Sequence, residues 1–255
     1  MWGRVYMPDA GKCRVYKRIA AGGVNGGFIR PGGMALTERA LSLCAFPPGS
    51  RLLDVGCGTG ATVECLIGEH GFLAAGVDPS FPMLAHGRAQ NPLLPLVRSD
   101  GESLPFFDGE WDGVLAECSL SLTRDPDAVL RECRRVLRRG GKLILSDIYV
   151  RNVGAIPELR ALSLHSCLKG ALSHDEIMGK LRNGGFVVLA WEDHSPALKH
   201  FVAQLILSQG SAQSLRCSLT DADPPDGFRI EQAVSRARLG YFLAVAEKSA
   251  SARCA

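Results

Sequence analysis

A glycine-rich segment preceded by an acidic residue carries the clearest chemical signal in the sequence. It reads LLDVGCGTG over residues 52–60 and joins an expected buried strand, 51–56, to an expected helix, 59–70. Glycines let a backbone turn sharply and let a ligand approach the main chain closely. Doubly wound sheets bind ligands beyond the carboxyl ends of their strands, which is where this loop falls. We therefore expect a ligand at Gly56 and Gly58.

Four carboxylates stand at or just after the carboxyl ends of expected strands, namely Asp54, Asp78, Asp100 and Glu117. Asp54 lies two residues before Gly56, where a carboxylate would repel a pyrophosphate but attract a cation. Asp78 is placed to accept hydrogen bonds from two ribose hydroxyls. The acids together predict a negatively charged crevice that suits a cationic ligand bearing a ribose.

The same loop, together with Ala61, also fits the G-x-G-x-x-A pattern of dinucleotide-binding proteins. A nicotinamide-dependent oxidoreductase is therefore an alternative. The acidic side chains of Asp54 and Glu117 argue against it, because a dinucleotide brings its own negative charge to this loop.

Strands and helices alternate along the first two thirds of the chain, which indicates a mainly parallel sheet covered on both faces. The expected strands are 51–56, 72–78, 93–98, 111–117, 142–149, 186–191 and 241–247. The expected helices are 35–45, 59–70, 80–90, 125–138, 173–183 and 196–209. Because no long crossover helix separates the last two strands, we expect one of them to run antiparallel. Ser173 and Glu176 predict a capping box at the start of helix 173–183.

Composition places the protein among globular chains without an obligatory nucleic-acid or membrane partner. It has 255 residues, 46% of them hydrophobic, and a formal charge of +3. No run of 18 apolar residues occurs, and the first 30 residues lack the apolar core of a secretory signal. None of the nine cysteines forms a C-x-x-C pair, so we expect a reducing, cytoplasmic location. Residues 1–33 are basic and glycine-rich, and we expect them to form an N-terminal arm that acts as a lid.

Over about residues 30–190 the sequence resembles the class I S-adenosylmethionine-dependent methyltransferases. The resemblance is carried by LLDVGCGTG (52–60), GVDPS (76–80), SDGESLPF (99–106), WDGVLAE (111–117) and RRVLRRGGKL (134–143). The set is most similar to methyltransferase type 11 and, within it, to the quinone-biosynthesis branch. It implies a Rossmann-like, doubly wound, mainly parallel seven-stranded sheet with one antiparallel strand, an N-terminal helical arm and a C-terminal cap. Residues 34–255 would form the methyltransferase domain.

The resemblance also assigns roles around S-adenosylmethionine, whose product is S-adenosylhomocysteine. The methionine part would contact Gly56, Gly58 and Glu117 or Cys118, and Arg30 would reach the methionine carboxylate. The ribose and adenine would contact Asp78, Pro79, Met83, Asp100 and Gly101. The complete expected cofactor site is Arg30, Asp54, Gly56, Cys57, Gly58, Asp78, Pro79, Met83, Asp100, Gly101, Glu117 and Cys118.

The sequence says less about the methyl acceptor. The sulfonium of S-adenosylmethionine already activates the methyl group, so the reaction needs no catalytic triad that a motif could reveal. We expect a small-molecule acceptor and a monomer or homodimer. The segment SCLKGAL (166–172) also resembles arsenite methyltransferases, in which Cys167 would bind trivalent arsenic, and Cys57 matches a second cysteine of that group. Cys44 and Cys217 do not match further ones. The sequence therefore also allows an arsenite or thiol methyltransferase, or a protein that binds S-adenosylmethionine without catalysis.

Two further groups of residues could do chemistry. His194 follows Trp191-Glu192-Asp193 and is a candidate base or acceptor-binding residue, as Cys167 is a candidate catalytic residue. His165, Cys167 and His174 lie close in sequence, but their spacing fits no zinc pattern, so we expect no metal.

Overall fold

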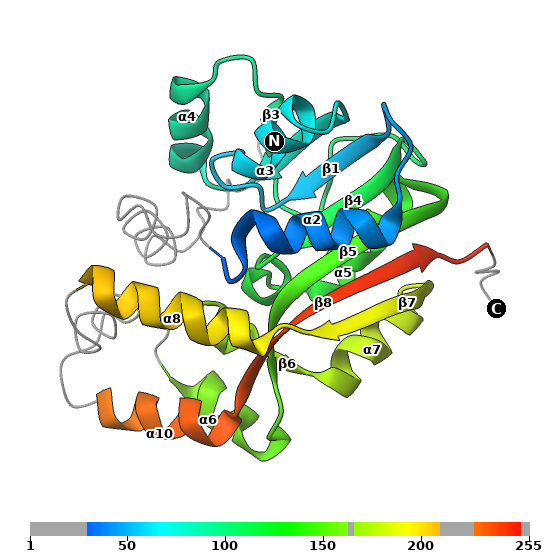
Figure 1. Cartoon of the computed structure of the whole chain (residues 1–255). Helices are drawn as coiled ribbons and strands as arrows, with labels where there is room; N and C mark the ends of the chain where they lie inside the picture. The colour runs from blue at the N-terminus through cyan, green and yellow to red at the C-terminus, as the bar shows by residue number, and fades with distance from the viewer. Residues whose placement is uncertain (1–29, 163–165, 210–226, 251–255) are drawn as a thin grey trace, which may run out of the picture.

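One sheet forms the centre of the molecule. The structure is a computed structural model and describes residues 30–162, 166–209 and 227–250. The strand order is β3-β2-β1-β4-β5-β8-β7, with β6 paired to β5 (Figure 1). The first four strands are β1 (Arg51–Val55), β2 (Leu73–Asp78), β3 (Leu96–Arg98) and β4 (Trp111–Glu117). They pair in parallel, so their carboxyl ends meet at one edge of the sheet.

The second half of the sheet contains the antiparallel strand. It is built from β5 (Leu137–Val150), β6 (Leu172–Ser173), β7 (Phe186–Asp193) and β8 (Leu239–Lys248). β8 runs antiparallel to both β5 and β7 and lies between them. The expected seven-stranded arrangement with one antiparallel strand is thus confirmed, and the two-residue β6 adds an eighth strand.

Helices lie on both faces of this sheet, and those expected from the sequence begin or end close to their expected boundaries. The helices are α2 (Gly33–Cys44), α3 (Ala61–Gly68), α4 (Phe81–Gln90), α5 (Pro126–Val136), α6 (Ile156–Ala161), α7 (His174–Asn183), α8 (Ser195–Gln209) and α10 (Gly227–Ala237). The described residues also form the short 3-10 turns η2 (Leu120–Leu122), η3 (Val153–Ala155) and η4 (Cys167–Gly170). The expected capping box is present: the Ser173 hydroxyl accepts from the Glu176 main-chain N–H, and the Glu176 carboxylate accepts from that of Ser173.

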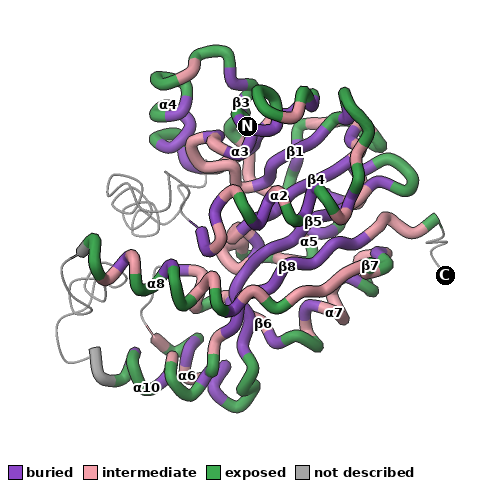
Figure 2. The backbone as a smooth tube through the Cα atoms, viewed as in Figure 1, coloured by how far each residue is buried: buried purple, intermediate pink, exposed green. Residues whose placement is uncertain are grey.

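Two hydrophobic clusters follow from the alternation of side chains along the strands. Leu52 faces a cluster that includes residues of α2, α3, α6 and α10, whereas its neighbour Leu53 faces α5 and α7. Figure 2 shows β5 and β8 buried along most of their length, while the edge strand β7 is partly exposed. The core therefore holds the carboxyl ends of β1 and β4 in fixed positions.

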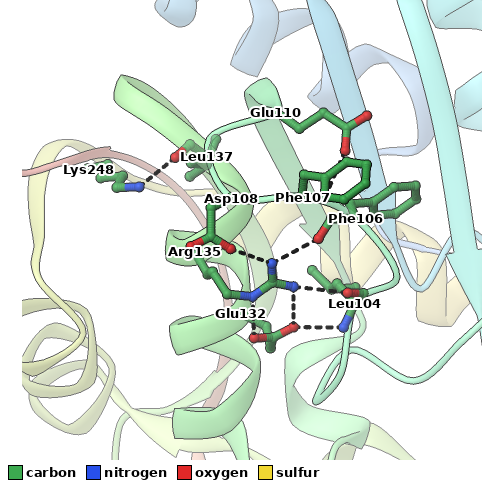
Figure 3. A network of polar contacts seen from close by, with 9 residues as sticks. All are labelled: Leu104, Phe106, Phe107, Asp108, Glu110, Glu132, Arg135, Leu137 and Lys248. Atoms are coloured by element: carbon green, nitrogen blue, oxygen red, sulfur yellow. Dashed lines mark hydrogen bonds and ion pairs between the residues drawn. The ribbon is translucent and has the colours of Figure 1, made fainter.

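The basic segment around α5 is bound to the protein itself. The Arg135 guanidinium donates to the carboxylates of Glu132 and Asp108 and to the carbonyls of Leu104 and Phe106 (Figure 3). These contacts fasten the loop before β4 to α5, and the hydrogen bonds that Arg135 donates to Glu132 and Asp108 raise its pKa. Arg135 therefore stabilises the contact between α5 and the loop before β4.

The expected arm falls almost entirely outside the described residues, since only 30–33 of its 33 residues belong to them. Cys217 and His165 lie outside them as well. No helix in the described part of the chain combines the length and apolar character that a bilayer crossing needs.

Candidate functional site

The glycine loop between β1 and α3 adopts a backbone that other residues rarely take. Gly56, Gly58 and Gly60 have φ angles of 88°, 57° and 85°. At Gly56 a Cβ atom would lie 2.4 Å from the Cβ of Ser119, so a side chain there would collide with the end of β4. At Gly58 the nearest atom to such a Cβ would be the Met83 methyl carbon at 3.5 Å. The loop therefore presents main chain, not side chains, to a ligand.

Asp78 fixes this loop to the end of β2. One carboxylate oxygen accepts the Gly58 N–H at 2.9 Å, and the other accepts the Ser80 N–H at 2.8 Å. Burial raises the pKa of Asp78, and these two hydrogen bonds oppose the rise. Each oxygen keeps lone-pair capacity for a further donor. The arrangement suits two adjacent hydroxyls, as on a ribose.

The acids at the ends of β1 and β4 are the most deeply buried part of the site. Asp54 is 3% exposed and Glu117 8% exposed. Burial, followed by the charge of Glu117, raises the pKa of Asp54 to about 8. At neutral pH Asp54 is therefore largely protonated. The expected crevice is less negatively charged than a count of its acids suggests.

Arg30 and Thr37 lie against Glu117 on the α2 side of the sheet. The Arg30 guanidinium lies 2.9 Å from Glu117 Oε2 and donates to the Thr37 hydroxyl at 2.5 Å. That hydroxyl in turn donates to Glu117 Oε1 at 2.8 Å. Burial lowers the pKa of Arg30, but Glu117 and other acidic neighbours outweigh it and the net effect is upward. In the described structure Arg30 thus pairs with Glu117, the residue expected beside it at the methionine end.

Asp100 and Gly101 follow β3, on the side of the site where we expect the adenine. Oδ1 of Asp100 is buried and has no hydrogen-bond partner in the described structure. A buried acceptor without a partner is unfavourable, and a bound donor would satisfy it. A Cβ on Gly101 would lie 3.0 Å from a Val55 methyl, so Gly101 packs closely against the end of β1. Met83 on α4 is 6% exposed and lies beside Gly58.

Cys118 directly follows Glu117 at the end of β4. It has φ 52°, a conformation that is uncommon for residues other than glycine. Its thiol is 3.0 Å from the Tyr241 hydroxyl, which also lies 3.3 Å from the Ser146 hydroxyl. Burial raises the pKa of the Cys118 thiol well above its usual range. Burial also raises the pKa of nearby Asp147 to about 6, although three hydrogen bonds to its carboxylate oppose the rise.

The two expected catalytic residues occupy different surroundings. Cys167 lies on η4 near Cys118, whose pKa it influences, and η4 packs so closely on η2 that a Cβ on Gly170 would lie 2.0 Å from the Ser121 carbonyl. His194 follows β7, and its Nε2 is 2.9 Å from Glu192 Oε2. Glu192 is also held by Arg39 of α2. His194 therefore contacts a surface ion pair, and no described contact joins it to Glu117 or Cys118.

Sequence reasoning did not single out Thr37, Ser119 and Tyr241, which contact or adjoin the expected site residues. Thr37 is fully buried and shares the apolar face of α2 with Leu36, Ala40 and Leu41. A hydroxyl among the apolar residues of that helix face could have indicated a buried hydrogen-bonding role for Thr37. Tyr241 has no such signal, because an aromatic residue in a buried strand is ordinary core.

Comparison with known proteins gives a family for the central part of the chain. Residues 53–145 match the family described as a methyltransferase domain. A demethylmenaquinone methyltransferase of Renibacterium salmoninarum is 34% identical over 100 residues, which cover 39% of this chain and 42% of that protein. A phosphatidylethanolamine N-methyltransferase of Cereibacter sphaeroides is 32% identical over 114 residues, covering 42% of this chain and 55% of that protein. The chain thus matches about half or less of the length of these relatives.

Solved structures show the same fold over most of the chain. The [4+2]-cyclase SpnF aligns with a TM-score of 0.73 at 22% identity and covers 95% of this chain and 96% of its own. Phosphoethanolamine N-methyltransferase 2 of Haemonchus contortus, in complex with S-adenosyl-L-methionine, aligns with a TM-score of 0.67 at 18% identity. That alignment covers 92% of this chain and 56% of the other. The expected Rossmann-like fold and the resemblance to methyltransferases are both confirmed.

Proposed function

We propose that this chain, whose residues 53–145 match a methyltransferase domain, transfers a methyl group from S-adenosylmethionine to a small-molecule acceptor. The observation that supports this most strongly is the Asp78 carboxylate, which is held by the Gly58 and Ser80 N–H groups at the end of β2. It stands beside a loop of exposed main chain and is placed for two vicinal hydroxyls. Asp100 Oδ1, buried without a partner in the described structure, is a suitable acceptor for an adenine amino group.

The chemistry divides simply between cofactor and protein. S-adenosylmethionine supplies a methyl group already activated by a sulfonium. The residues of the chain bind and orient the two reactants and exclude water. Gly56 and Gly58 provide close main-chain contact, and Glu117 with Arg30 provides opposite charges for the amino and carboxylate groups of a methionine. The hydroxyls and thiol of Ser146, Tyr241 and Cys118 border the position from which an acceptor would attack.

A nicotinamide cofactor has less support. A pyrophosphate at the glycine loop would bring negative charge towards the buried Glu117 carboxylate, whose charge is already balanced by Arg30, whereas the largely protonated Asp54 adds little repulsion. The curated relatives that match residues of this segment are named as methyltransferases that act on demethylmenaquinone and on phosphatidylethanolamine. Quinol and amine acceptors are therefore the first to test.

We further propose that the protein works in a reducing compartment such as the cytoplasm. The described cysteines, which are Cys44, Cys57, Cys65, Cys118, Cys133 and Cys167, all stand as thiols outside any disulfide. Thiols persist where glutathione and thioredoxin keep them reduced.

The test is a calorimetric titration of the full chain with S-adenosylmethionine and, separately, with NAD. We expect binding of the first only. Asp78→Ala should weaken it by roughly ten- to a hundredfold or more, because hydrogen bonds to a charged group contribute about 1.5–3 kcal/mol each. Asp175→Ala, at an almost fully exposed aspartate on α7, is the matched control and should bind normally.

Binding alone does not establish transfer, since one protein with this fold is described as a cyclase. The second measurement is therefore turnover: release of S-adenosylhomocysteine in the presence of a panel of quinol, amine and thiol acceptors. Tight binding without turnover on any acceptor class would favour a protein that binds S-adenosylmethionine without methylating. Equal affinity in wild type and Asp78→Ala would contradict the site.

A further inference from the structure

Three side chains of different chemistry, from α2, from α3 and from the turn after α3, lie close together. Glu38 belongs to α2, Cys65 to α3, and His70 to the turn after α3. One donor atom from each lies within 4.8 Å of the donor atoms of the other two. His70 Nε2 and Glu38 Oε1 are 2.7 Å apart. Glu69 faces the same thiol and adds negative charge there.

This donor set is the one that zinc prefers. Zinc takes thiolate, imidazole and carboxylate ligands in a tetrahedron at about 2.0–2.3 Å, which places the ligand atoms about 3.2–3.8 Å from one another. Magnesium and calcium prefer oxygen ligands alone, so a thiolate and an imidazole select against them. The three donors need to move by about one ångström or less to reach these distances. The side chains of Glu38 and His70 are 42% and 26% exposed, so they have room for that movement and the ion has a path of entry.

We propose that Glu38, Cys65 and His70 form a zinc site, with water at the fourth position. The cluster is partly preorganised. The His70 ring stacks on Phe72, with ring centroids 5.6 Å apart and an angle of 11° between the planes. Phe72 is buried, and its N–H donates to the Leu66 carbonyl of α3 at 3.0 Å, which fixes the turn that carries His70.

The site would connect two helices that both serve the cofactor region. Glu38 directly follows Thr37, the residue that links Arg30 to Glu117. Cys65 lies on α3, the helix that begins at the end of the glycine loop. A zinc ion bound to both helices would hold α2 in place and would stabilise the fold, because an ion that binds only the folded chain shifts the folding equilibrium.

The test uses the full-length protein and the metal alone. The protein is equilibrated with Zn²⁺, excess metal is removed by gel filtration, and bound zinc is measured by mass spectrometry. We expect about one equivalent per chain. Substitution by Co²⁺ should give the strong visible bands of a tetrahedral site and a thiolate-to-cobalt charge-transfer band in the near ultraviolet. Mg²⁺ in excess should displace neither ion.

Variants separate this site from adventitious binding. Cys65→Ser should remove the charge-transfer band. His70→Gln should weaken zinc binding by more than about tenfold, since changing even a residue that only hydrogen-bonds to a metal ligand costs that much. His86→Gln, on α4 and outside the cluster, is the control and should bind like wild type. If Cys65→Ser folds poorly, zinc binding by His70→Gln tests the site instead, because the His70 side chain is partly exposed and its replacement should not disturb folding. Stoichiometry far below one, or zinc and cobalt signals that survive both Cys65→Ser and His70→Gln, would overturn the proposal.

Discussion

The Arg30 guanidinium and the Glu117 carboxylate form an ion pair at 2.9 Å whose side chains are only 9% and 3% exposed. Arg30 shortly precedes α2, and Glu117 is the last residue of β4, so the pair joins the start of the helix to the carboxyl edge of the sheet. The Thr37 hydroxyl bridges the two side chains. A buried ion pair needs such additional hydrogen bonds to offset the loss of hydration.

The bridging hydroxyl leads to the first prediction. Thr37→Val keeps the side-chain shape but removes both hydrogen bonds of the bridge. We expect S-adenosylmethionine affinity to fall by about five- to tenfold, since one net hydrogen bond contributes about 1 kcal/mol. Calorimetry measures the effect, Thr37→Ser should restore affinity, and Ser42→Ala on the exposed face of α2 should leave it unchanged. Unchanged affinity in Thr37→Val would show that the bridge does not shape the site.

Much of this site could be predicted because its signals are local. The glycine loop and the acids Asp78 and Glu117 stand at fixed places relative to strands that hydrophobic runs already reveal. Parallel pairing then brings strand ends together without further information. The protonation of Asp54 could not be predicted in this way, because its pKa depends on burial and on Glu117, and both come from tertiary structure.

Residues that come together from distant parts of the chain could not be predicted from local sequence patterns. Tyr241 reaches Cys118 because β8 inserts antiparallel beside β5, and no periodicity encodes that insertion. Glu38, Cys65 and His70 likewise come together only when α2 packs near α3. Cys167 and His194 are catalytic candidates on sequence grounds alone, and their roles stay predictions.

Asp54 leads to a prediction about pH. Burial and the charge of Glu117 raise its pKa to about 8, so it becomes ionised as pH rises through 8. An ionised Asp54 attracts a sulfonium, and the affinity for S-adenosylmethionine should therefore increase between about pH 6 and 9. S-adenosylhomocysteine has no sulfonium charge but carries the same amino and carboxylate groups. Its affinity should change less over the same range.

The measurement is the ratio of the two dissociation constants as a function of pH. In Asp54→Asn the side chain no longer titrates, so the ratio should become nearly constant. A wild-type ratio that is flat with pH would mean that Asp54 does not sense the sulfonium.

Arg135 supports a prediction about stability. It contacts Glu132, Asp108 and the carbonyls of Leu104 and Phe106, so Arg135→Ala leaves several of these groups without a donor. We expect the free energy of unfolding to fall by about 1.5–3 kcal/mol, as for hydrogen bonds to charged groups. Urea denaturation measures it.

The matched control is Arg131→Ala on the same helix. Its guanidinium lies 3.6 Å from the Asp125 carboxylate and its side chain is 65% exposed, so the loss should be below about 0.5 kcal/mol. Equal losses in the two variants would mean that the loop before β4 does not depend on Arg135.

The last prediction separates an organic acceptor from trivalent arsenic, which needs several thiolates around it. Of the three thiols nearest the site in the described structure, Cys118 and Cys167 lie near each other, but Cys57 faces a different element. Cys57 faces β2, since a Cβ on Gly76 would lie 2.6 Å from its sulfur, and the Cys118 thiol is hydrogen-bonded to Tyr241. We therefore expect no methylated product from arsenite with excess thiol, and we expect Cys167→Ser to keep both S-adenosylmethionine affinity and turnover on an organic acceptor. Chromatography with mass spectrometry of the products decides between the two. Abundant methylated arsenic from the wild type, lost in Cys167→Ser, would reassign Cys167 as an arsenic ligand.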